Sequence, residues 1–229
     1  MADARLRLAG ASPGRARQAG QASDLGKRLF DLVVASACLL MLLSLLAAVA
    51  VLVRLTTPGP ALYRQIRLGQ GRRPFMLYKF RTMYNDCGDE VHRQYVRSLA
   101  TEENPKAGGQ RGLYKLEDDA RITPLGRVLR QLSIDELPQL FNVLKGDMSL
   151  VGPRPVLSWE AELLQPPYDQ RFIVMAGMTG LWQVSGRNRL TFRQALELDV
   201  EYARRRCFAL DLVILLKTIP LVLTGRGAL

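Results

Sequence analysis

The chain has 229 residues, which is long enough for one domain with a hydrophobic core of its own. Lysine and arginine number 32 against 21 acidic residues, so the formal net charge is +11, and the isoelectric point is about 10.1. This balance predicts an anionic partner: nucleic acid, anionic lipid or a phosphorylated substrate. The single histidine excludes a multi-histidine metal site, and three widely spaced cysteines argue against a disulfide framework.

Residues 1–24 are rich in alanine, glycine, serine and arginine. This composition predicts a disordered basic tail. The tail and the apolar run after it do not form a signal peptide pattern, because no small-residue cleavage motif follows the run.

Residues 25–56 contain that run, which is uncharged from Leu32 to Val53. At about 1.5 Å per residue a helix over the run is about 33 Å long, enough to cross a hydrocarbon core of roughly 30 Å. The alternative is a buried helix of a soluble protein. The length and the leucine, alanine and valine content favour a membrane helix.

Positive charge lies on both sides of the run. Lysine and arginine precede it between Arg5 and Arg28, and they follow it between Arg54 and Arg81, where no acidic residue occurs. Because positive residues mark the cytoplasmic side, a spanning helix would violate the rule at one end. A re-entrant hairpin satisfies it at both ends and is favoured here. Ser44 is the side chain available in mid-run to bend the helix.

The next segment predicts a small β-hairpin. Thr57–Pro60 reads as a turn, and two short strands, Ala61–Tyr63 and Phe75–Tyr78, flank the glycine-containing segment Gly69–Arg73. After the second strand, Lys79 and Arg81 are expected on one side of an extended segment. They are candidates to bind phosphate, and the alternative is a solvated basic strand edge. No site is predicted in residues 85–118.

A basic helix is predicted from Thr123, an N-cap followed by Pro124 at the first helical position. Its apolar positions recur with helical spacing. Arg127 and Arg130 lie on the other face.

Asp135 and Glu136 follow at the predicted start of a further helix. The apolar face of that helix is expected to consist of Leu137, Leu140, Phe141 and Leu144. Pro138 is tolerated in a first turn, and Lys145 with Gly146 ends the helix. Taken alone, an acidic pair at a helix start is more often a cap, here a Ser133–Glu136 capping box, than a catalyst. The basic helix before the pair and Gly152–Pro155 after it favour chemistry on a phosphate.

The rest of the chain predicts helices and one glycine-rich segment. A helix at Ser158–Leu164 ends before Pro166. Gly177–Asn188 has the composition of a ligand-binding loop, the alternative being a structural turn with Trp182 in the core. A helix over Thr191–Arg204 precedes the apolar stretch Phe208–Leu223, which is too short and polar to span a membrane and is expected at the interface or on the domain.

These segments resemble the bacterial sugar transferase family, the monotopic phosphoglycosyl transferases. The likeness runs from about Lys27 to the C-terminus and rests on five blocks: Lys27–Asp31, Tyr78–Met83, Asp135–Asp147, Gly152–Pro155 and Gly180–Asn188. One departure is the absence of a proline beside Ser44, where family members have a Ser-Pro break. The implied fold is α+β and mainly helical. It comprises the membrane helix, the small hairpin, interfacial amphipathic helices and a compact catalytic domain at residues 57–229.

The resemblance implies transfer of a sugar 1-phosphate from a UDP-sugar to polyprenol (undecaprenyl) phosphate, with release of UMP. By match, Asp135 is the nucleophile that forms an aspartyl-phosphosugar intermediate, Glu136 assists it, and both hold Mg²⁺. The implied substrate-binding residues are Arg130, Arg154, Lys79, Arg81, Gln183 and Arg187. A guanidinium fork suits phosphate oxygens.

The implied location is the cytoplasmic (inner) membrane, with the catalytic domain facing the cytoplasm, and the reaction would begin exopolysaccharide, O-antigen or glycan assembly. Glucose or galactose is the expected sugar, with a modified N-acetylated sugar as the alternative. Nucleic acid is not expected as a partner, and homodimerisation is left open. The competing hypotheses are a membrane-anchored basic module without enzymatic activity and a scaffold that has lost activity.

Overall fold

The computed structural model describes residues 13–85, 88, 90, 93, 94, 96, 97, 119–164, 166–186 and 190–224. Side chains are described from Asp24 onward, with that of Leu223 excepted. Residues 1–12 of the predicted basic tail and Arg187 of the predicted ligand set therefore lie outside the described residues.

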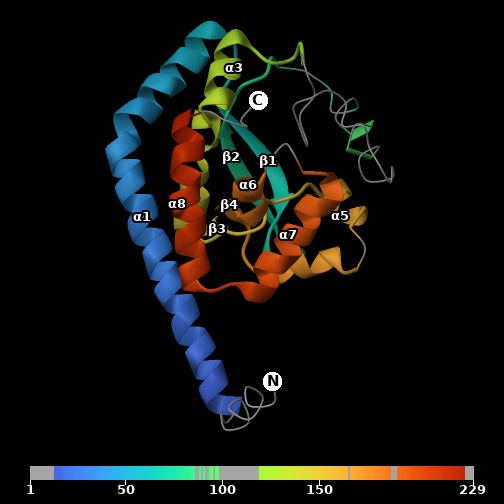
Figure 1. Cartoon of the computed structure of the whole chain (residues 1–229). Helices are drawn as coiled ribbons and strands as arrows, with labels where there is room; N and C mark the ends of the chain where they lie inside the picture. The colour runs from blue at the N-terminus through green and yellow to red at the C-terminus, as the bar shows by residue number, and fades with distance from the viewer. Residues whose placement is uncertain are drawn as a thin grey trace.

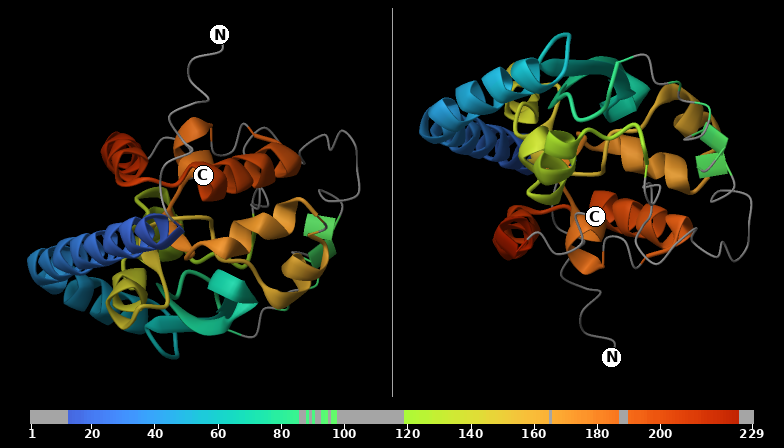
Figure 2. Two further views of the ribbon diagram at one scale, coloured as in Figure 1. Left: turned by 90° about the horizontal axis from the view of Figure 1, so that it is seen from below. Right: turned by 90° about the horizontal axis from the view of Figure 1, so that it is seen from above.

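The N-terminal helix α1 (Pro13–Thr56) contains the predicted membrane segment and begins before it. Its part from Asp24 to Thr56 is long and apolar enough to cross a membrane, and 22% of its most apolar window is buried in the protein. The helix bends in its apolar part, so that its two halves run in different directions (Figure 1, Figure 2). One narrow face packs on the domain: Ala35, Leu39, Leu46, Val49 and Val53.

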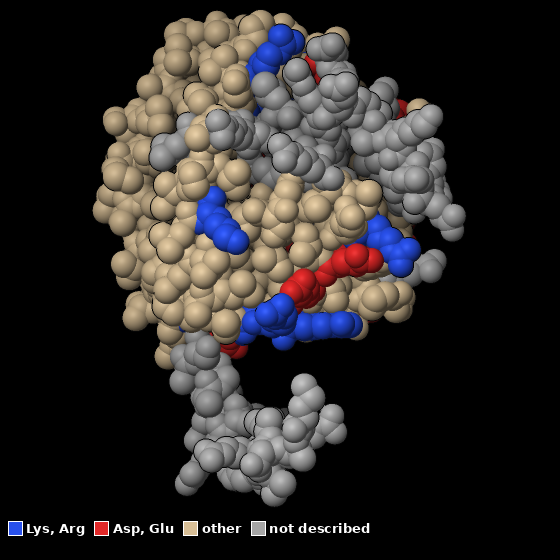
Figure 3. Space-filling model, in the orientation of Figure 1, with Lys and Arg blue, Asp and Glu red and all other residues tan. Residues whose placement is uncertain are grey.

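The other faces of α1 expose large apolar side chains, among them Leu40, Met41 and Leu43. The C-terminal helix α8 (Phe208–Thr224) lies beside α1 in Figure 1 and also exposes apolar residues, including Leu216 and Ile219. In Figure 3 the side formed by α1 is uncharged, and charged side chains gather over α7 (Phe192–Arg205). This asymmetry supports membrane association on the α1 side.

The predicted hairpin is confirmed. Strand β1 (Leu62–Leu68) pairs antiparallel with β2 (Pro74–Phe80), in a register that runs from Leu62 opposite Phe80 to Leu68 opposite Pro74. The connection contains the short 3-10 turn η1 (Gln70–Arg72), in which Gly71 and Arg72 have positive φ. Both strands are longer than predicted because backbone pairing continues outside the short apolar pieces, through Arg64–Leu68 in β1 and Lys79–Phe80 in β2.

The basic helix α3 (Pro124–Gln131) starts as predicted: the Thr123 Oγ1 accepts a hydrogen bond from the Gly126 nitrogen at 2.9 Å. The prediction that a helix starts at Asp135 is wrong. Residues Ile134–Glu136 form a separate 3-10 turn, η2, and α4 (Gln139–Lys145) begins after Pro138. Gly146 in the left-handed conformation ends α4, as predicted.

After α4, two three-residue strands pair in parallel: β3 (Ser149–Val151) and β4 (Gly177–Thr179). Between them lie α5 (Ser158–Glu162) and the 3-10 turn η3 (Tyr168–Ile173). The backbones of Gly152 and Gly177 approach so closely that a Cβ on Gly177 would lie 2.0 Å from the Gly152 nitrogen. Glycine is therefore required at this crossing of the two segments.

Gly177–Ser185 is not the predicted loop, because it forms β4 and the short helix α6 (Leu181–Ser185). Trp182 is 6% exposed and packs in a cluster with Val156, Phe172 and Leu196. The structural alternative, with Trp182 in the core, is correct for this residue. A second cluster lies between α1, the hairpin, α4 and β3.

The part of α1 just before its apolar run is tied to the domain by buried polar contacts. The Lys27 Nζ lies 3.4 Å from Asp31 Oδ1 and 3.0 Å from Asp211 Oδ2. The Ser149 hydroxyl donates to Asp31 at 2.7 Å, and the Tyr202 hydroxyl donates to Asp211 at 2.6 Å. Side chains of α1, β3, α7 and α8 thus meet at one end of the membrane helix.

Candidate active site

The acidic pair lies on the η2 turn. Ser133 has φ of 55°, and its carbonyl oxygen accepts a hydrogen bond from the Glu136 nitrogen at 3.3 Å, which closes the turn. The Ser133 side chain makes no capping hydrogen bond, so the predicted capping-box alternative does not form. Asp135 is 8% exposed, whereas the Glu136 side chain is 32% exposed. Adjacent carboxylates therefore occupy different environments.

Glu136 joins two predicted substrate-binding residues. Its Oε1 lies 2.8 Å from the Lys79 Nζ of β2 and 3.8 Å from the Arg154 Nη1 of the turn after β3. Three segments distant in sequence thus bring their charged side chains to one place. A carboxylate between two cations holds both of them where a phosphate could meet them.

Arg130 reaches the same site from α3. Its Nε donates to the Thr82 hydroxyl at 2.9 Å. Burial lowers the pKa of the Arg130 guanidinium, and the charge of Asp135 is the strongest opposing influence. Arg130 remains a cation because guanidinium pKa values lie far above neutral pH. The site therefore combines two carboxylates with three cations.

Arg81 lies elsewhere. Its guanidinium donates to carbonyl oxygens at the C-terminal end of α1, at 3.3 Å for Val53 and 2.8 Å for Thr57. It also donates to the Pro58 carbonyl and, at 3.2 Å, to Asn85. The structure therefore places Arg81 as a cap of α1 and does not bring it together with Asp135.

Gln183 lies in α6, and its Oε1 is buried without a hydrogen-bond partner among the described residues. Gly180, the N-cap of α6, packs against Gly152 at the start of the Pro-Arg-Pro turn. Gln183 is thereby on the same side of the domain as that turn.

The sequence reasoning did not single out the residues that support the site. Thr82 belongs to the matched block Tyr78–Met83, which is the signal that could have found it. Arg28 donates to the Val143 and Leu144 carbonyls at the end of α4, at 2.7 and 3.1 Å. Arg28 thereby joins the membrane helix to the helix that follows the acidic pair.

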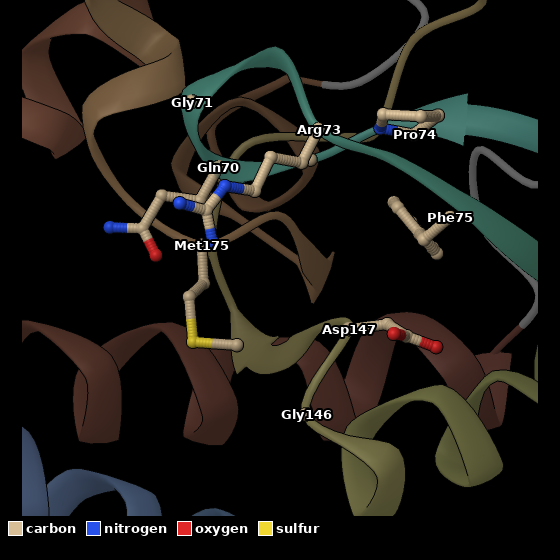
Figure 4. Close-up of a pocket in the computed structure, with 9 residues that line it drawn as sticks. Gln70, Gly71, Arg73, Pro74, Phe75, Gly146, Asp147 and Met175 are labelled. Atoms are coloured by element: carbon tan, nitrogen blue, oxygen red, sulfur yellow. The ribbon is translucent and has the colours of Figure 1, made fainter.

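A cavity of about 580 Å³ lies away from this site. It is bounded by the β1–β2 turn, Gly146, Asp147 and Met175, and Figure 4 shows Gln70 and Arg73 projecting beside Met175. These residues lie beyond the C-terminal end of α4, whereas Asp135 precedes its N-terminal end. None of the predicted site residues that the structure describes lines the cavity.

The acidic pair is compatible with Mg²⁺. Among the described residues no group of three or more histidine, cysteine, aspartate or glutamate side chains could hold a metal ion. Mg²⁺ is commonly held by one or two carboxylates together with substrate phosphates and water, so a complete protein cage is not required. Asp135 and Glu136 are the residues of this site that could hold such an ion.

A sequence model of the bacterial sugar transferase family matches residues 22–225. The chain is 40% identical over 205 residues to the exopolysaccharide production protein ExoY of Sinorhizobium fredii, covering 89% of this chain and 88% of that protein. It is 40% identical over 216 residues to the UDP-glucose:undecaprenyl-phosphate glucose-1-phosphate transferase of Caulobacter vibrioides, covering 90% and 73%.

The chain is also 40% identical over 213 residues to the undecaprenyl-phosphate galactose phosphotransferase of Salmonella typhimurium, covering 92% of this chain and 43% of that protein. All the site residues described above lie within the matched range. The predicted family and the transferase class are confirmed. The chain belongs to the bacterial sugar transferase family.

Proposed function

We propose that the protein transfers a sugar 1-phosphate from a UDP-sugar to polyprenol phosphate and releases UMP. The observation that carries this proposal is the contact of Lys79 and Arg154 with Glu136, next to Asp135, whose charge acts on Arg130. Cations from three separate segments form a suitable environment for a diphosphate, whose charge would otherwise repel an attacking carboxylate.

Asp135 is the proposed nucleophile. It is the more buried of the two carboxylates and lies on a short hydrogen-bonded turn, which limits its movement. Glu136 is already held by Lys79 and Arg154, so its proposed part is to orient these cations. A positioned nucleophile within a charged frame is the arrangement that covalent phosphoryl transfer requires.

The proposed reaction has two displacements at the phosphorus next to the sugar. A carboxylate oxygen of Asp135 forms a bond to this phosphorus, the bond to the bridging oxygen breaks, and UMP leaves with the electron pair. A phosphate oxygen of the polyprenol phosphate then attacks the same phosphorus, and the Asp135 carboxylate is released. Arg130 and Arg154 hold non-bridging phosphate oxygens in both steps.

Asp135 and Glu136 would also hold Mg²⁺. When bound, the ion supplies positive charge that offsets repulsion between the carboxylate and the diphosphate and stabilises the UMP leaving group.

We further propose that α1 enters the cytoplasmic membrane and returns to the same side. Two sets of contacts support this topology. Lys27 and Arg28 attach the start of the apolar part of α1 to the domain, and Arg81 attaches its C-terminal end. A single polar domain cannot contact both ends of a helix whose ends lie on opposite sides of a bilayer. The catalytic domain would then face the cytoplasm, and the positive residues on both flanks support this orientation.

The proposed sugar is a hexose, glucose or galactose, in exopolysaccharide or related glycan assembly. The names of the Caulobacter and Salmonella relatives, which specify glucose and galactose, support this choice.

The proposal is tested by UMP release from a panel of UDP-sugars with polyprenol phosphate and Mg²⁺. Asp135→Asn should lower turnover by roughly 10³-fold or more, because the amide is not a nucleophile. Glu201→Gln is the matched control, since Glu201 lies in a solvent-accessible pair with Arg205 on α7. Retained turnover in Asp135→Asn would refute the nucleophile assignment, and preference for an N-acetylated donor would refute the hexose assignment.

A further inference from the structure

The Pro-Arg-Pro turn is held through its own backbone carbonyls. The Pro153 oxygen accepts from the Gly177 nitrogen at 2.9 Å. The Arg154 oxygen accepts from Arg171 Nη2 at 2.6 Å, and the Pro155 oxygen accepts from Arg67 Nη1 at a longer 3.4 Å. Three consecutive carbonyls are thus bound by donors from three different segments, and the two prolines fix φ on either side of Arg154.

Arg171 is itself fixed by a buried carboxylate. Its Nη2 lies 2.7 Å from Asp199 Oδ2 of α7, and both side chains are 3% exposed. Removing two charges from water costs about as much as their attraction returns, so such a pair is weak evidence for stability. Its presence next to the site calls for a role other than stability.

The orientation of the Arg171 guanidinium suits its hydrogen bond to the Pro-Arg-Pro turn better than its ion pair with Asp199. An arginine and a carboxylate bind most strongly through two parallel hydrogen bonds. Here Arg171 Nη1 and Asp199 Oδ1 have no hydrogen-bond partner among the described residues, while the single atom Nη2 contacts both Asp199 and the Arg154 carbonyl. The guanidinium is therefore placed to reach the turn, at the cost of the second bond to Asp199.

The turn determines where the Arg154 side chain begins. The Nη1 of Arg154 lies 3.8 Å from Glu136 Oε1, and the Arg154 side chain is 32% exposed. A long side chain with this exposure needs a fixed backbone origin to remain near one phosphate position. A displacement of about 1 Å can cost up to about 100-fold in rate.

We propose that Arg171, held by Asp199, is a positioning residue that fixes the backbone of Arg154 and so aims its guanidinium at the phosphate beside Asp135 and Glu136. This inference rests on the proposed function, in which Arg154 holds a phosphate oxygen. Arg67, paired with Glu160 at 3.4 Å, acts in the same way on Pro155 through its longer contact.

The test removes the whole pair, because loss of one partner would leave an unpaired buried charge. The variant Arg171→Met/Asp199→Leu is compared with the wild type in full-length protein, with and without Arg154→Ala. The readouts are kcat and KM for UMP release, and the midpoint of thermal unfolding. The matched control is Arg205→Gln/Glu201→Gln, which removes a solvent-accessible pair from the same helix.

The pair variant should lose about 10- to 100-fold in kcat/KM when Arg154 is present and less than about 3-fold when Arg154 is already alanine. Its unfolding midpoint should stay close to that of the wild type, and the control should match the wild type in both readouts. Arg171→Lys, which keeps a donor and the charge, should retain more activity than the pair variant.

Equal losses in both backgrounds would overturn the proposal, because they would mean that the pair acts on the fold and not through Arg154. An unchanged rate in the pair variant would overturn it as well. If Arg154→Ala alone leaves the rate unchanged, the phosphate role of Arg154 fails, and positioning through it fails with it. The proposed reaction is tested separately by Asp135→Asn.

Discussion

Lys79 and Arg81 show how two cations only two residues apart come to contact different groups. Lys79 contacts Glu136 at the site, whereas Arg81 donates to carbonyl oxygens in and just after the last turn of α1. In an extended strand, residues i and i+2 share a face, which is why both were expected to bind phosphate. Strand β2 ends at Phe80, so the rule no longer applies to Arg81.

Arg81→Ala should therefore reduce stability and leave donor binding nearly unchanged. The substitution removes buried hydrogen bonds from a charged donor, for which we expect a loss of about 2–4 kcal/mol in the free energy of unfolding. The measurements are thermal unfolding in detergent and KM for the UDP-sugar, with Arg64→Ala on the exposed side of β1 as the control. A raised KM with an unchanged unfolding midpoint would restore Arg81 to the substrate-binding set.

Asp199 gives a prediction about pH. Burial raises the pKa of Asp199 from 3.8 to about 6, although Arg171 and Arg154 oppose the shift. Between about pH 4 and 6 the folded state keeps a proton that the unfolded state has released. Protonation of Asp199 therefore contributes fully to the free energy of unfolding below about pH 4, and this contribution is lost as the pH rises through 6.

Asp199→Asn should remove this contribution. The fall in the free energy of unfolding from pH 4 to pH 7 should be smaller in the variant by up to about 3 kcal/mol. Thermal unfolding of both proteins across this range checks it, with Glu201→Gln as the control on the same helix. An identical pH dependence in wild type and Asp199→Asn would contradict the prediction.

Part of the site could be predicted at this scale. Asp135, Glu136, Lys79, Arg130 and Arg154 were named from the sequence, and the structure brings them together. Arg171 and Asp199 could not be named, because a buried ion pair depends on contacts between distant segments and leaves no local pattern.

At the scale of helices and strands, the sequence predicted correctly those helix starts that depend on contacts between neighbouring residues. Thr123 with Pro124 marked the start of α3, and Thr191 marked that of α7. The start of α4 was misjudged because Ile134–Glu136 closes a separate 3-10 turn and α4 begins only after Pro138. The turn begins at Ser133, whose left-handed conformation few non-glycine residues adopt. The pairing of β3 with β4 was missed because each strand has three residues and the pairing depends on close glycine contacts.

The attachment of α1 to α4 can be tested at Arg28. Its two hydrogen bonds satisfy carbonyls that a helix end leaves without partners. Arg28→Ala should lower the free energy of unfolding by about 1–3 kcal/mol, and it should also lower turnover because α4 follows directly after η2. Lys145→Ala is the matched control, since Lys145 is an exposed cation in the last turn of α4. Equal effects of the two substitutions would show that charge near the helix end, and not the hydrogen bonds, is what matters.

At the scale of the whole molecule, the chain combines one apolar side with a charged, folded domain. Figure 3 shows this division, and the contacts of Lys27, Arg28 and Arg81 join the two parts. Composition and charge predicted both parts, because a long uncharged run and a basic remainder are visible in the sequence. They could not show which domain elements the helix ends contact.

The topology is tested by cysteine labelling in a background without Cys38, Cys87 and Cys207. Single cysteines at positions 17 and 72 should both react with an impermeant reagent only when the cytoplasmic face is accessible, as expected for a helix that re-enters. Position 72 is exposed in the structure. Labelling of the two positions from opposite faces would establish a spanning helix instead.

The attachment of α1 at both ends has a consequence for the lipid substrate. A helix anchored at one end can tilt or slide when the thickness of the bilayer changes, but α1 is fixed to α4 at one end and to the segment after β2 at the other. In a bilayer the depth of Asp135 is therefore set by the protein. In the proposed reaction the phosphate of the lipid would therefore have to rise to meet the carboxylate, and the reach of its headgroup above the hydrocarbon would limit which lipids can react.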